Sequence, residues 1–460
     1  MCAGRTVDAQ DPVIPDAWRH GEVAVIGIAR SGSATSRWLA GRGVAVYASD
    51  VASTAATVVT AEQLRALGVA VEIGAHDVER VARAAAVIVS PGVPPDAPPV
   101  VAARAAGVAI RSELDVAAAA LAAAKLIVVT GTNGKSTTTA IIAHLLRASG
   151  IRAEAAGNIG RPLIELASEM PQPEWIAVEA SSFQLHDSPG LDPAVGVLTN
   201  LSPDHLDRYA SVEEYYADKR LLFRNASSRS VWILNGDDTA VLELAGDSAG
   251  TRRLWRLSAP ADAWYDRTTE RLMLEDTVLL ARRELPLLGE HNIENALAAA
   301  LAARSAGVAT EAIGQALTAF SPLPHRLEPV RDLDGVLWIN DSKATNLAST
   351  MKAARAMLRP FVLLLGGRHK GQPYTAIAPV LIGRCRGVVA FGEAAPLVER
   401  DLGDQVPVTA VDALDDAVAR SRALARSGDV VLLSPACASF DAFTDYEERG
   451  ERFRALVLSL

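Results

Sequence analysis

A glycine-containing loop between an apolar run and a helical stretch constrains this chain more than any other sequence feature. The loop is Thr130–Thr137, Thr-Gly-Thr-Asn-Gly-Lys-Ser-Thr, and it follows the apolar run Leu126–Val129. A buried strand that leads through such a loop into a helix turns backbone N–H groups and the helix N-terminus toward an anion. The lysine neutralises the anion and the hydroxyl can hold Mg²⁺. The segment therefore predicts a parallel α/β domain that binds a nucleoside triphosphate.

The loop departs from the general nucleotide-binding pattern at one position, because that pattern has a glycine where Val129 stands. The other positions supply the expected backbone and side-chain groups. The candidate phosphate contacts are Gly131, Thr132, Asn133, Gly134, Lys135, Ser136 and Thr137, and Ser136 is also a candidate metal ligand.

Composition bounds the class of protein. At 460 residues, half of them apolar and 22% charged, the chain is long enough for several packed domains. The net charge of -9 gives no reason to expect nucleic acid as a partner, so a phosphate-rich substrate must meet locally placed cations. The three cysteines are scattered and the chain starts without a basic, apolar leader, which predicts a cytoplasmic protein. Lys125 interrupts the apolar stretch before the loop, so no membrane span is predicted there.

Short β-rich runs alternate with alanine-rich helical runs in three successive segments, residues 1–116, 117–323 and 324–460. This alternation predicts an α/β fold of three domains: a Rossmann-like first domain, a central triphosphate-binding domain with a mostly parallel sheet, and a Rossmann-like third domain. In each domain a ligand is expected at the carboxyl ends of the strands. The expected strands are Val23–Ile26, Val44–Tyr47, Val69–Ile73, Ala86–Val89, Leu126–Val129, Trp175–Val178, Ala194–Leu198, Val336–Ile339, Phe361–Leu365, Val388–Phe391 and Val430–Leu433.

The first segment has a glycine turn, Gly27–Gly32, directly after its first strand. Ala29 stands where the dinucleotide fingerprint has a glycine, so a nicotinamide cofactor is not predicted. Asp50 lies where such folds place an acid against a sugar or base, and it equally suits an aspartate that ends a strand.

Three polar side chains of the second segment have both a functional and a purely structural interpretation. Glu179 ends an apolar strand, which suits a Mg²⁺ ligand or an ordinary strand end. His205, in Asn200–Tyr209, suits a metal or phosphate ligand or a solvated helix cap. Lys219 lies in an amphipathic helical pattern, Val212–Phe223, which favours a solvated helix face.

Further polar clusters follow later in the chain. Asn292 and Asn295 are spaced as neighbours on one helix, where they suit a cap or a recognition group. In the third segment, hydroxyls and cations follow three strand ends, which suggests a shared anion-binding face. These clusters are Asn340–Asn346, Gly366–Gly371 and Ser434–Ser439, and Pro324–Arg326 precedes them.

The set of motifs, in this order, resembles the Mur ligase family of ATP-dependent amide-forming enzymes in peptidoglycan precursor synthesis. The resemblance extends from Val23 to the expected final helix, Tyr446–Leu460. Three motifs are similar to the D-glutamate-adding member, and the Asp-Tyr-Ala-His type of signature of the diaminopimelate- or lysine-adding members is absent. Those three motifs are Ser181–Leu185, Asn340–Asn346 and Ser434–Ser439.

The resemblance implies a reaction and its cofactors. ATP phosphorylates the terminal carboxylate of UDP-N-acetylmuramoyl-L-alanine, and the amine of D-glutamate attacks the resulting acyl phosphate. Lys135 and Ser136 would hold the triphosphate and Mg²⁺, while Glu179 and His205 would hold metal. Lys219 would be carbamylated and help bind a second Mg²⁺, which reverses the interpretation from helical pattern alone.

The resemblance also assigns the remaining contacts. Asn295, Arg326 and Asp341 would contact the nucleotide, and Lys343 would order the reacting phosphate. The protein would be a monomer whose domains close over its small-molecule substrates. Thr345, Lys370 and Ser439 would hold D-glutamate, and Tyr446 would lie near that pocket, at a position where the family usually has phenylalanine. Asn158 and Gln184 would face the muramoyl group. The uridine end would contact Arg30, Ser31 and Asp50, although Val51 and Ala52 stand there in place of polar or basic residues.

Two alternatives belong to other functional classes. A non-catalytic ATP-binding protein on the same scaffold would be expected to lose Lys135, Glu179, His205 or Lys219, and the sequence keeps all four. A folate polyglutamate-adding enzyme would lack a first domain of the uridine-nucleotide type, whereas this chain has a separate Rossmann-like segment before the loop.

Overall fold

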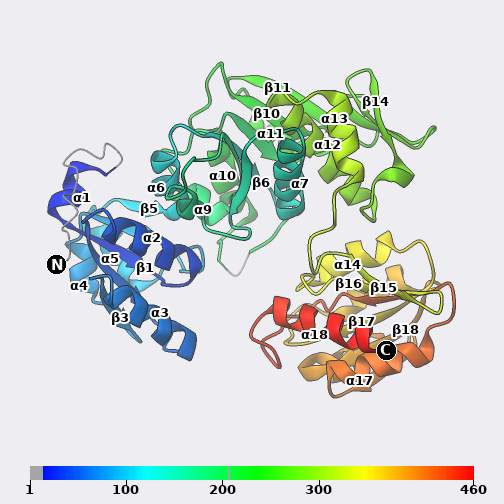
Figure 1. Cartoon of the computed structure of the whole chain (residues 1–460). Coiled ribbons are helices and arrows are strands. Elements are labelled where there is room, and N and C mark those ends of the chain that lie inside the picture. Colours follow the sequence, from blue (N-terminus) through cyan, green and yellow to red (C-terminus); the bar gives the residue numbers. More distant parts are fainter. Residues whose placement is uncertain (1–13, 206–207) are drawn as a thin grey trace. The chain divides into compact units, whose positions relative to one another are not determined.

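The computed structural model describes residues 14–205 and 208–460, so Asp207 of the Asn200–Tyr209 motif lies outside the described residues. The fold is α/β with three separate, mostly parallel sheets (Figure 1). The chain divides into two compact units. The first extends to Leu285 and includes Glu294–Ala319, and the second consists of Pro286–Ile293 and Phe320–Leu460.

The N-terminal domain is an all-parallel sheet in the order β3-β2-β1-β4-β5. The order reverses between β1 and β4, so the loops that follow these two strands flank the switch point where such sheets bind ligands. Its elements are α1 (Asp16–His20), β1 (Glu22–Ile26), α2 (Arg30–Ala40), β2 (Ala45–Asp50), α3 (Ala55–Arg65), β3 (Ala70–Ile73), α4 (Val78–Ala82), β4 (Ala86–Val89), α5 (Pro98–Ala105) and β5 (Ile110–Ser112).

The central domain has a nine-stranded sheet in the order β14-β13-β12-β11-β10-β9-β6-β8-β7, with α6 (Glu113–Ala120) leading into it. Its strands are β6 (Lys125–Thr130), β7 (Ala153–Gly157), β8 (Trp175–Glu179), β9 (Val195–Leu198), β10 (Val231–Asn235), β11 (Thr251–Arg256), β12 (Ala263–Asp266), β13 (Arg271–Leu274) and β14 (Thr277–Ala281). Its helices are α7 (Lys135–Ala148), α8 (Leu163–Leu166), α9 (Ser182–His186), α10 (Val212–Arg220), η1 (Leu221–Phe223), α11 (Thr239–Ala245), η2 (Arg282–Glu284), α12 (Glu290–Ser305) and α13 (Thr310–Thr318).

The C-terminal domain has the sheet order β15-β16-β20-β17-β18-β19, in which only β15 runs antiparallel to its neighbour. Apolar clusters cover both faces of this sheet. Its elements are β15 (Glu328–Leu333), β16 (Val336–Asn340), α14 (Leu347–Ala356), β17 (Phe361–Gly366), η3 (Tyr374–Ile377), α15 (Ala378–Leu381), β18 (Cys385–Phe391), η4 (Gly392–Ala394), α16 (Ala395–Leu402), β19 (Val408–Val411), α17 (Leu414–Leu424), β20 (Val430–Leu433) and α18 (Tyr446–Ser459).

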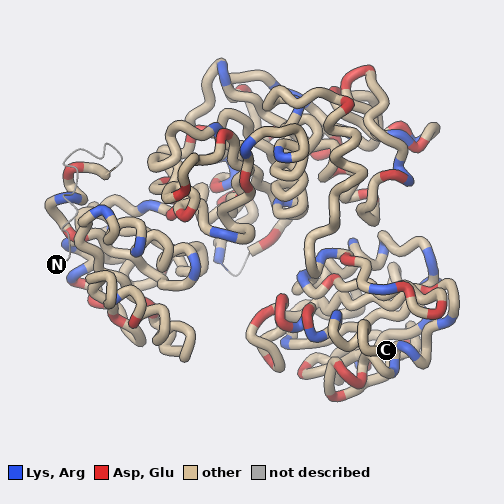
Figure 2. The backbone as a smooth tube through the Cα atoms, in the orientation of Figure 1, with Lys and Arg blue, Asp and Glu red and all other residues tan. Residues whose placement is uncertain are grey.

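Each strand expected from an apolar run is present, within a few residues of its expected bounds. The antiparallel extension β12–β14 was not expected, because its strands are only four or five residues long and each includes exposed or partly exposed positions, which gives little sequence signal. Charged residues are spread over all three domains (Figure 2). Among the described residues, no helix is long and apolar enough to cross a membrane.

Candidate active site

The glycine loop joins β6 to α7 as the sequence predicts. The strand ends at Thr130 and the helix begins at Lys135, which places the loop at the carboxyl edge of the parallel sheet. Gly131 and Gly134 have φ angles of 137° and 84°, a region that side-chain-bearing residues rarely adopt. A Cβ atom on Gly131 would lie 2.0 Å from Thr199 Oγ1, so the loop's path requires glycine there.

The two residues that directly follow β9, Thr199 and Asn200, hold the loop in shape, although neither was assigned a role from the sequence. The Thr199 hydroxyl donates to the Asn133 carbonyl oxygen at 2.7 Å. The side chain of Asn200 accepts a hydrogen bond from the Asn133 N–H at 3.0 Å and donates to its carbonyl oxygen at 3.0 Å. Their sequence signal was their place at a strand end; the contact itself is tertiary.

Two lysines share a carbonyl oxygen of the loop. Lys135 Nζ donates to the Gly131 and Thr132 carbonyl oxygens at 3.0 and 2.9 Å, and Lys219 Nζ donates to the Gly131 carbonyl oxygen at 2.8 Å. Lys219 is only 1% exposed, so the solvated position favoured by its helical pattern is wrong. Burial, and then the charge of Lys135, hold the pKa of the Lys219 amine well below its ordinary value.

Glu179 supplies a buried carboxylate at the end of β8, the strand next to β6. The residue is 3% exposed and its Oε2 atom has no hydrogen-bond partner, whereas Oε1 accepts from Asn158 Nδ2 at 3.2 Å. An unpartnered buried carboxylate oxygen is costly on its own and matches the hard oxygen ligand that Mg²⁺ prefers. With the anion-cradling loop beside it, this donor set fits a nucleotide with its metal ion.

Gln184 and His205 lie in the same domain. The Gln184 oxygen accepts from the N–H and hydroxyl of Ser181 in a capping box, and its buried Nε2 atom has no partner. His205 has a φ of 53°, and its ring contacts Phe183 edge-on at 5.3 Å between centroids. No group of three or more His, Cys, Asp or Glu side chains suited to a metal ion occurs among the residues that the structure describes.

Asn295 reaches the loop from α12. It is 5% exposed, its Oδ1 atom accepts from the Thr138 hydroxyl at 3.2 Å, and a Cβ atom on Gly134 would lie 2.3 Å from that oxygen. The first unit therefore brings together the glycine loop, Lys219, Glu179 and Asn295.

The uridine-end candidates lie in and around the N-terminal domain's switch-point loops. The two Asp50 carboxylate oxygens accept hydrogen bonds from the backbone N–H groups of Ile28 and Ala52, at 2.9 Å each. This aspartate therefore orders the loops that follow β1 and β2. The Arg30 guanidinium donates to the Gly160 carbonyl oxygen at 3.3 Å, and the Ser31 carbonyl oxygen accepts from the Thr35 hydroxyl at 2.8 Å.

In the second unit, the predicted groups follow the carboxyl ends of β16, β17 and β20. Asp341 is buried and accepts from the Ser434 hydroxyl at 2.8 Å and from the Leu327 N–H at 3.2 Å. Burial raises the pKa of this carboxyl, and the positive charge of Arg326, which favours the ionised form, opposes that rise. Lys343 Nζ lies 3.8 Å from the centroid of the Tyr446 ring. Ser439 is buried, Thr345 is half-buried and Lys370 is exposed.

Arg449 is a buried cation that the sequence interpretation did not identify. Its guanidinium donates to the hydroxyl and carbonyl oxygens of Ser342 at 2.9 and 2.8 Å and to the Cys437 carbonyl oxygen at 3.1 Å. Burial lowers the pKa of Arg449 to about 10. The residue thus joins α18 to two of the loops that carry the predicted contacts, and its signal, one arginine in a charged helix, was too common to stand out.

The buried carboxyl of Asp341 predicts a pH-dependent stability. Burial raises the pKa of Asp341 from its ordinary value of 3.8 to about 7, against the opposing effect of the Ser434 hydrogen bond. Because the folded form holds its proton more tightly, this stabilisation is complete below about pH 4 and lost as the pH rises to about 7, on the order of 4 kcal/mol at most. Asp341→Asn should reduce this fall, measured by urea unfolding between about pH 5 and about pH 8. Equal pH slopes for both proteins would contradict the prediction.

This is a multidomain nucleotide-binding α/β protein, as defined by its three sheets, its glycine loop and the buried side chains of Lys219 and Glu179. The comparisons with known proteins narrow this class. Residues 21–112 match the Mur ligase MurD-like N-terminal domain, residues 129–303 the Mur ligase middle domain, and residues 325–437 the Mur ligase glutamate ligase domain. The chain belongs to the Mur ligase family, whose members are ATP-dependent.

Two similar curated proteins are UDP-N-acetylmuramoylalanine--D-glutamate ligases. The one from Salinibacter ruber is 40% identical over 97% of this chain and 99% of its own length. The one from Myxococcus xanthus is 41% identical over 95% of this chain and 98% of its own length. The solved structure of UDP-N-acetylmuramate-alanine ligase MurC from Thermotoga maritima has a TM-score of 0.62 at 20% identity and covers 96% of this chain and 100% of its own; at that identity the likeness concerns the fold.

Proposed function

We propose that this chain joins D-glutamate to UDP-N-acetylmuramoyl-L-alanine at the expense of ATP, as a step of peptidoglycan precursor synthesis. The observation that carries the proposal is Lys219, a buried amine bonded to the glycine loop through the Gly131 carbonyl oxygen at 2.8 Å, in a domain that also buries Glu179 with an unpartnered oxygen. The full-length similarity to D-glutamate ligases supports the choice of substrates.

The proposed reaction has two steps. The terminal carboxylate of the UDP substrate attacks the γ-phosphorus of ATP and forms an acyl phosphate, with ADP leaving. The amine of D-glutamate then attacks the acyl carbon, loses a proton, and the phosphate departs with the electrons of its bond. Both steps bring anions together, so positioned cations lower the barrier.

The chain's own groups have distinct parts in this reaction. Lys135 and the N–H groups at the start of α7 would hold the triphosphate, while Asn295, Arg326 and Asp341 would contact the nucleotide. Lys343 would order the reacting phosphate; Thr345, Lys370 and Ser439, with Tyr446 nearby, would hold D-glutamate. Asn158 and Gln184 would face the muramoyl group, and Arg30, Ser31 and Asp50 the uridine end.

Ser136, Glu179, His205 and a carbamylated Lys219 would hold Mg²⁺ at two sites, and bound Mg²⁺ supplies charge neutralisation at the phosphates. The lowered pKa of Lys219 supports the carbamate, because a neutral amine adds to CO₂ and releases a proton, whereas an ammonium does not. The domain boundaries predicted at residues 116 and 323, a monomeric state and a cytoplasmic location complete the proposal.

Glu179→Gln tests the metal role directly. The glutamine keeps the size and one oxygen but removes the charge, so the Mg²⁺ concentration for half-maximal activity should rise roughly tenfold or more. Glu174→Gln, at a half-exposed ion pair with Arg152 in the same domain, is the matched control and should behave as the unchanged protein. An unchanged Mg²⁺ requirement for Glu179→Gln would exclude the role.

Phosphate release with ATP, UDP-N-acetylmuramoyl-L-alanine and a panel of amino acids tests the proposed substrates. Release should require D-glutamate. Release without any amino acid, or equal release with L-glutamate, would overturn the proposal, and no release would favour a non-catalytic ATP-binding protein. The same assay with a folate acceptor tests the other alternative.

A further inference from the structure

Glu113 is a buried carboxyl outside every group assigned above. It is the first residue of α6 and follows directly on the segment that matches the N-terminal domain model. It is 1% exposed. The neighbouring Ser112 is fixed to the central domain, because its N–H donates to the Asp187 carbonyl oxygen at 2.7 Å and its hydroxyl lies 2.6 Å from that of Ser188. The connection between the two domains is therefore anchored where Glu113 begins the helix.

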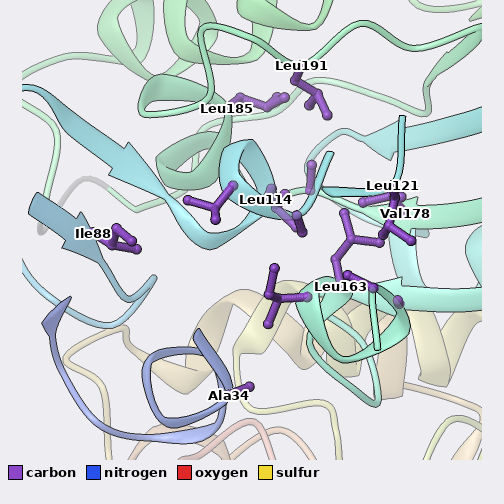
Figure 3. Packing of buried hydrophobic residues seen from close by; sticks show 14 of the residues in the cluster. Ala34, Ile88, Leu114, Leu121, Leu163, Val178, Leu185 and Leu191 are labelled. Carbon is purple, nitrogen blue, oxygen red and sulfur yellow. The ribbon is translucent and has the colours of Figure 1, made fainter. Parts of the chain in front are cut away.

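Glu113 caps a helix that is distant in sequence. The helix α8 begins after Pro162, and no side chain at that N-cap position accepts a hydrogen bond from it. Instead, Glu113 Oε1 accepts from the Ile164 N–H at 2.6 Å. Leu114, which follows Glu113, and Leu163, which precedes Ile164, lie in the same apolar cluster (Figure 3). A charged or polar acceptor at a helix N-terminus satisfies a backbone donor that would otherwise be buried without a partner.

The segment just before α8 carries a predicted substrate contact. A hydrogen bond from the Gly157 N–H to the Arg161 carbonyl oxygen, at 3.0 Å, closes this segment into a compact loop. Within the loop, the Asn158 N–H donates to the Glu179 carbonyl oxygen at 2.9 Å, and Asn158 Nδ2 donates to Glu179 Oε1 at 3.2 Å. The position of α8 therefore fixes one end of the loop that holds both Asn158 and the Glu179 carboxylate.

Glu113 is a more costly helix cap than a serine or asparagine, because it buries a second carboxyl oxygen. Glu113 Oε2 is buried and has no hydrogen-bond partner. Burial raises the pKa of Glu113 to about 7, so a large share of this carboxyl is neutral near neutral pH. A serine or asparagine caps a helix without burying a second oxygen. Local rules of this kind are most often broken where a residue serves a site.

We propose that Glu113 is a positioning residue that caps α8 from the interdomain connection and so holds the Asn158 loop against Glu179 for the UDP substrate. The inference rests on the proposed function, since it names the residue that orders one part of that site. Glu113 itself touches no reacting group.

Steady-state kinetics of Glu113→Ala and Glu113→Gln test the inference. Glu113→Ala should raise KM for the UDP substrate roughly tenfold while KM for ATP changes less than about twofold. The reason is that the Asn158 loop loses its anchor at α8, whereas the contacts of the glycine loop stay intact. Glu113→Gln keeps an oxygen acceptor at the same place and should restore KM for the UDP substrate to within about twofold of the unchanged protein. Glu174→Ala, which removes a half-exposed glutamate of the same domain, is the control.

Hydrogen exchange of the peptide that contains residues 157–166 provides a second measurement, which needs no substrate. Exchange should accelerate in Glu113→Ala and not in Glu113→Gln, and it can be read on the Gln variant and the control even if the Ala variant is poorly folded. Parallel increases in both KM values, an unchanged KM in Glu113→Ala, or a Gln variant that behaves like Ala would overturn the inference. If the unchanged protein lacks D-glutamate-dependent activity, the proposed function fails instead, and the exchange data still decide whether Glu113 is the cap.

Discussion

Lys219→Ala is expected to lose ligase activity by roughly 100-fold or more while the protein keeps its fold, because the substitution removes a buried group at the phosphates where charge develops. The side chain is 1% exposed and bonded to the Gly131 carbonyl oxygen. If Lys219 acts as a carbamate, the missing group is an anion with two oxygens. A short-chain carboxylate such as formate or acetate should then restore part of the activity, measured as phosphate release over a range of added carboxylate.

The choice of rescuing agent separates two chemical roles for Lys219. Rescue by methylamine instead of a carboxylate would mean that the residue works as an ammonium ion, which would contradict the carbamate. Full activity of Lys219→Ala without any addition would exclude both roles. Lys125→Ala is the matched control, because Lys125 is an exposed lysine of the same domain that lies over Trp175. Its activity should stay unchanged.

Gly131→Ala is expected to abolish nucleotide binding in the range that titration calorimetry measures. An added Cβ atom would lie 2.0 Å from Thr199 Oγ1 and 3.1 Å from the Asn200 backbone nitrogen, on a backbone with φ of 137°. The loop must move to relieve this overlap, and the Thr199–Asn133 and Asn200–Asn133 hydrogen bonds are lost with its shape. The affinity for ATP should fall at least roughly 100-fold, since the phosphate contacts depend on the loop's backbone.

Gly150→Ala separates the clash from the cost of backbone strain. Gly150 also has a positive φ, 80°, but nothing lies within 4 Å of its added Cβ atom. Its substitution should lower the free energy of unfolding by about 1 kcal/mol and leave ATP affinity unchanged. If Gly131→Ala binds ATP as tightly as Gly150→Ala does, the loop is not the nucleotide cradle.

The sequence predicted the fold where the physical signal was local. Continuous apolar runs such as Phe361–Leu365 are typical of strands buried on both faces, and the structure confirms them. The β12–β14 extension escaped prediction because its strands are only four or five residues long and mix buried with exposed or partly exposed residues. The Lys-Ser pair at the start of α7 was predictable for the same local reason, since loop and helix are contiguous.

The parts of the site that depend on tertiary contacts were harder to predict. The pattern around Lys219 gives no sign that its helix turns this residue beneath the glycine loop; only the family resemblance pointed to a buried, functional lysine. The partners that shape the loop, Thr199 and Asn200, come from another strand. The Glu113–Ile164 bond joins residues 51 positions apart, and such a cap has no local sequence signature.

Oxygen transfer from the UDP substrate to phosphate tests the proposed reaction most directly. UDP-N-acetylmuramoyl-L-alanine with ¹⁸O in its terminal carboxylate is incubated with ATP, Mg²⁺ and D-glutamate, and the released phosphate is analysed by mass spectrometry. An acyl-phosphate route predicts that each phosphate carries a single ¹⁸O atom and that label appears only when D-glutamate is present to complete the turnover. Phosphate without label, released at the same rate, would contradict the carboxylate as the phosphoryl acceptor and with it the proposed ligase.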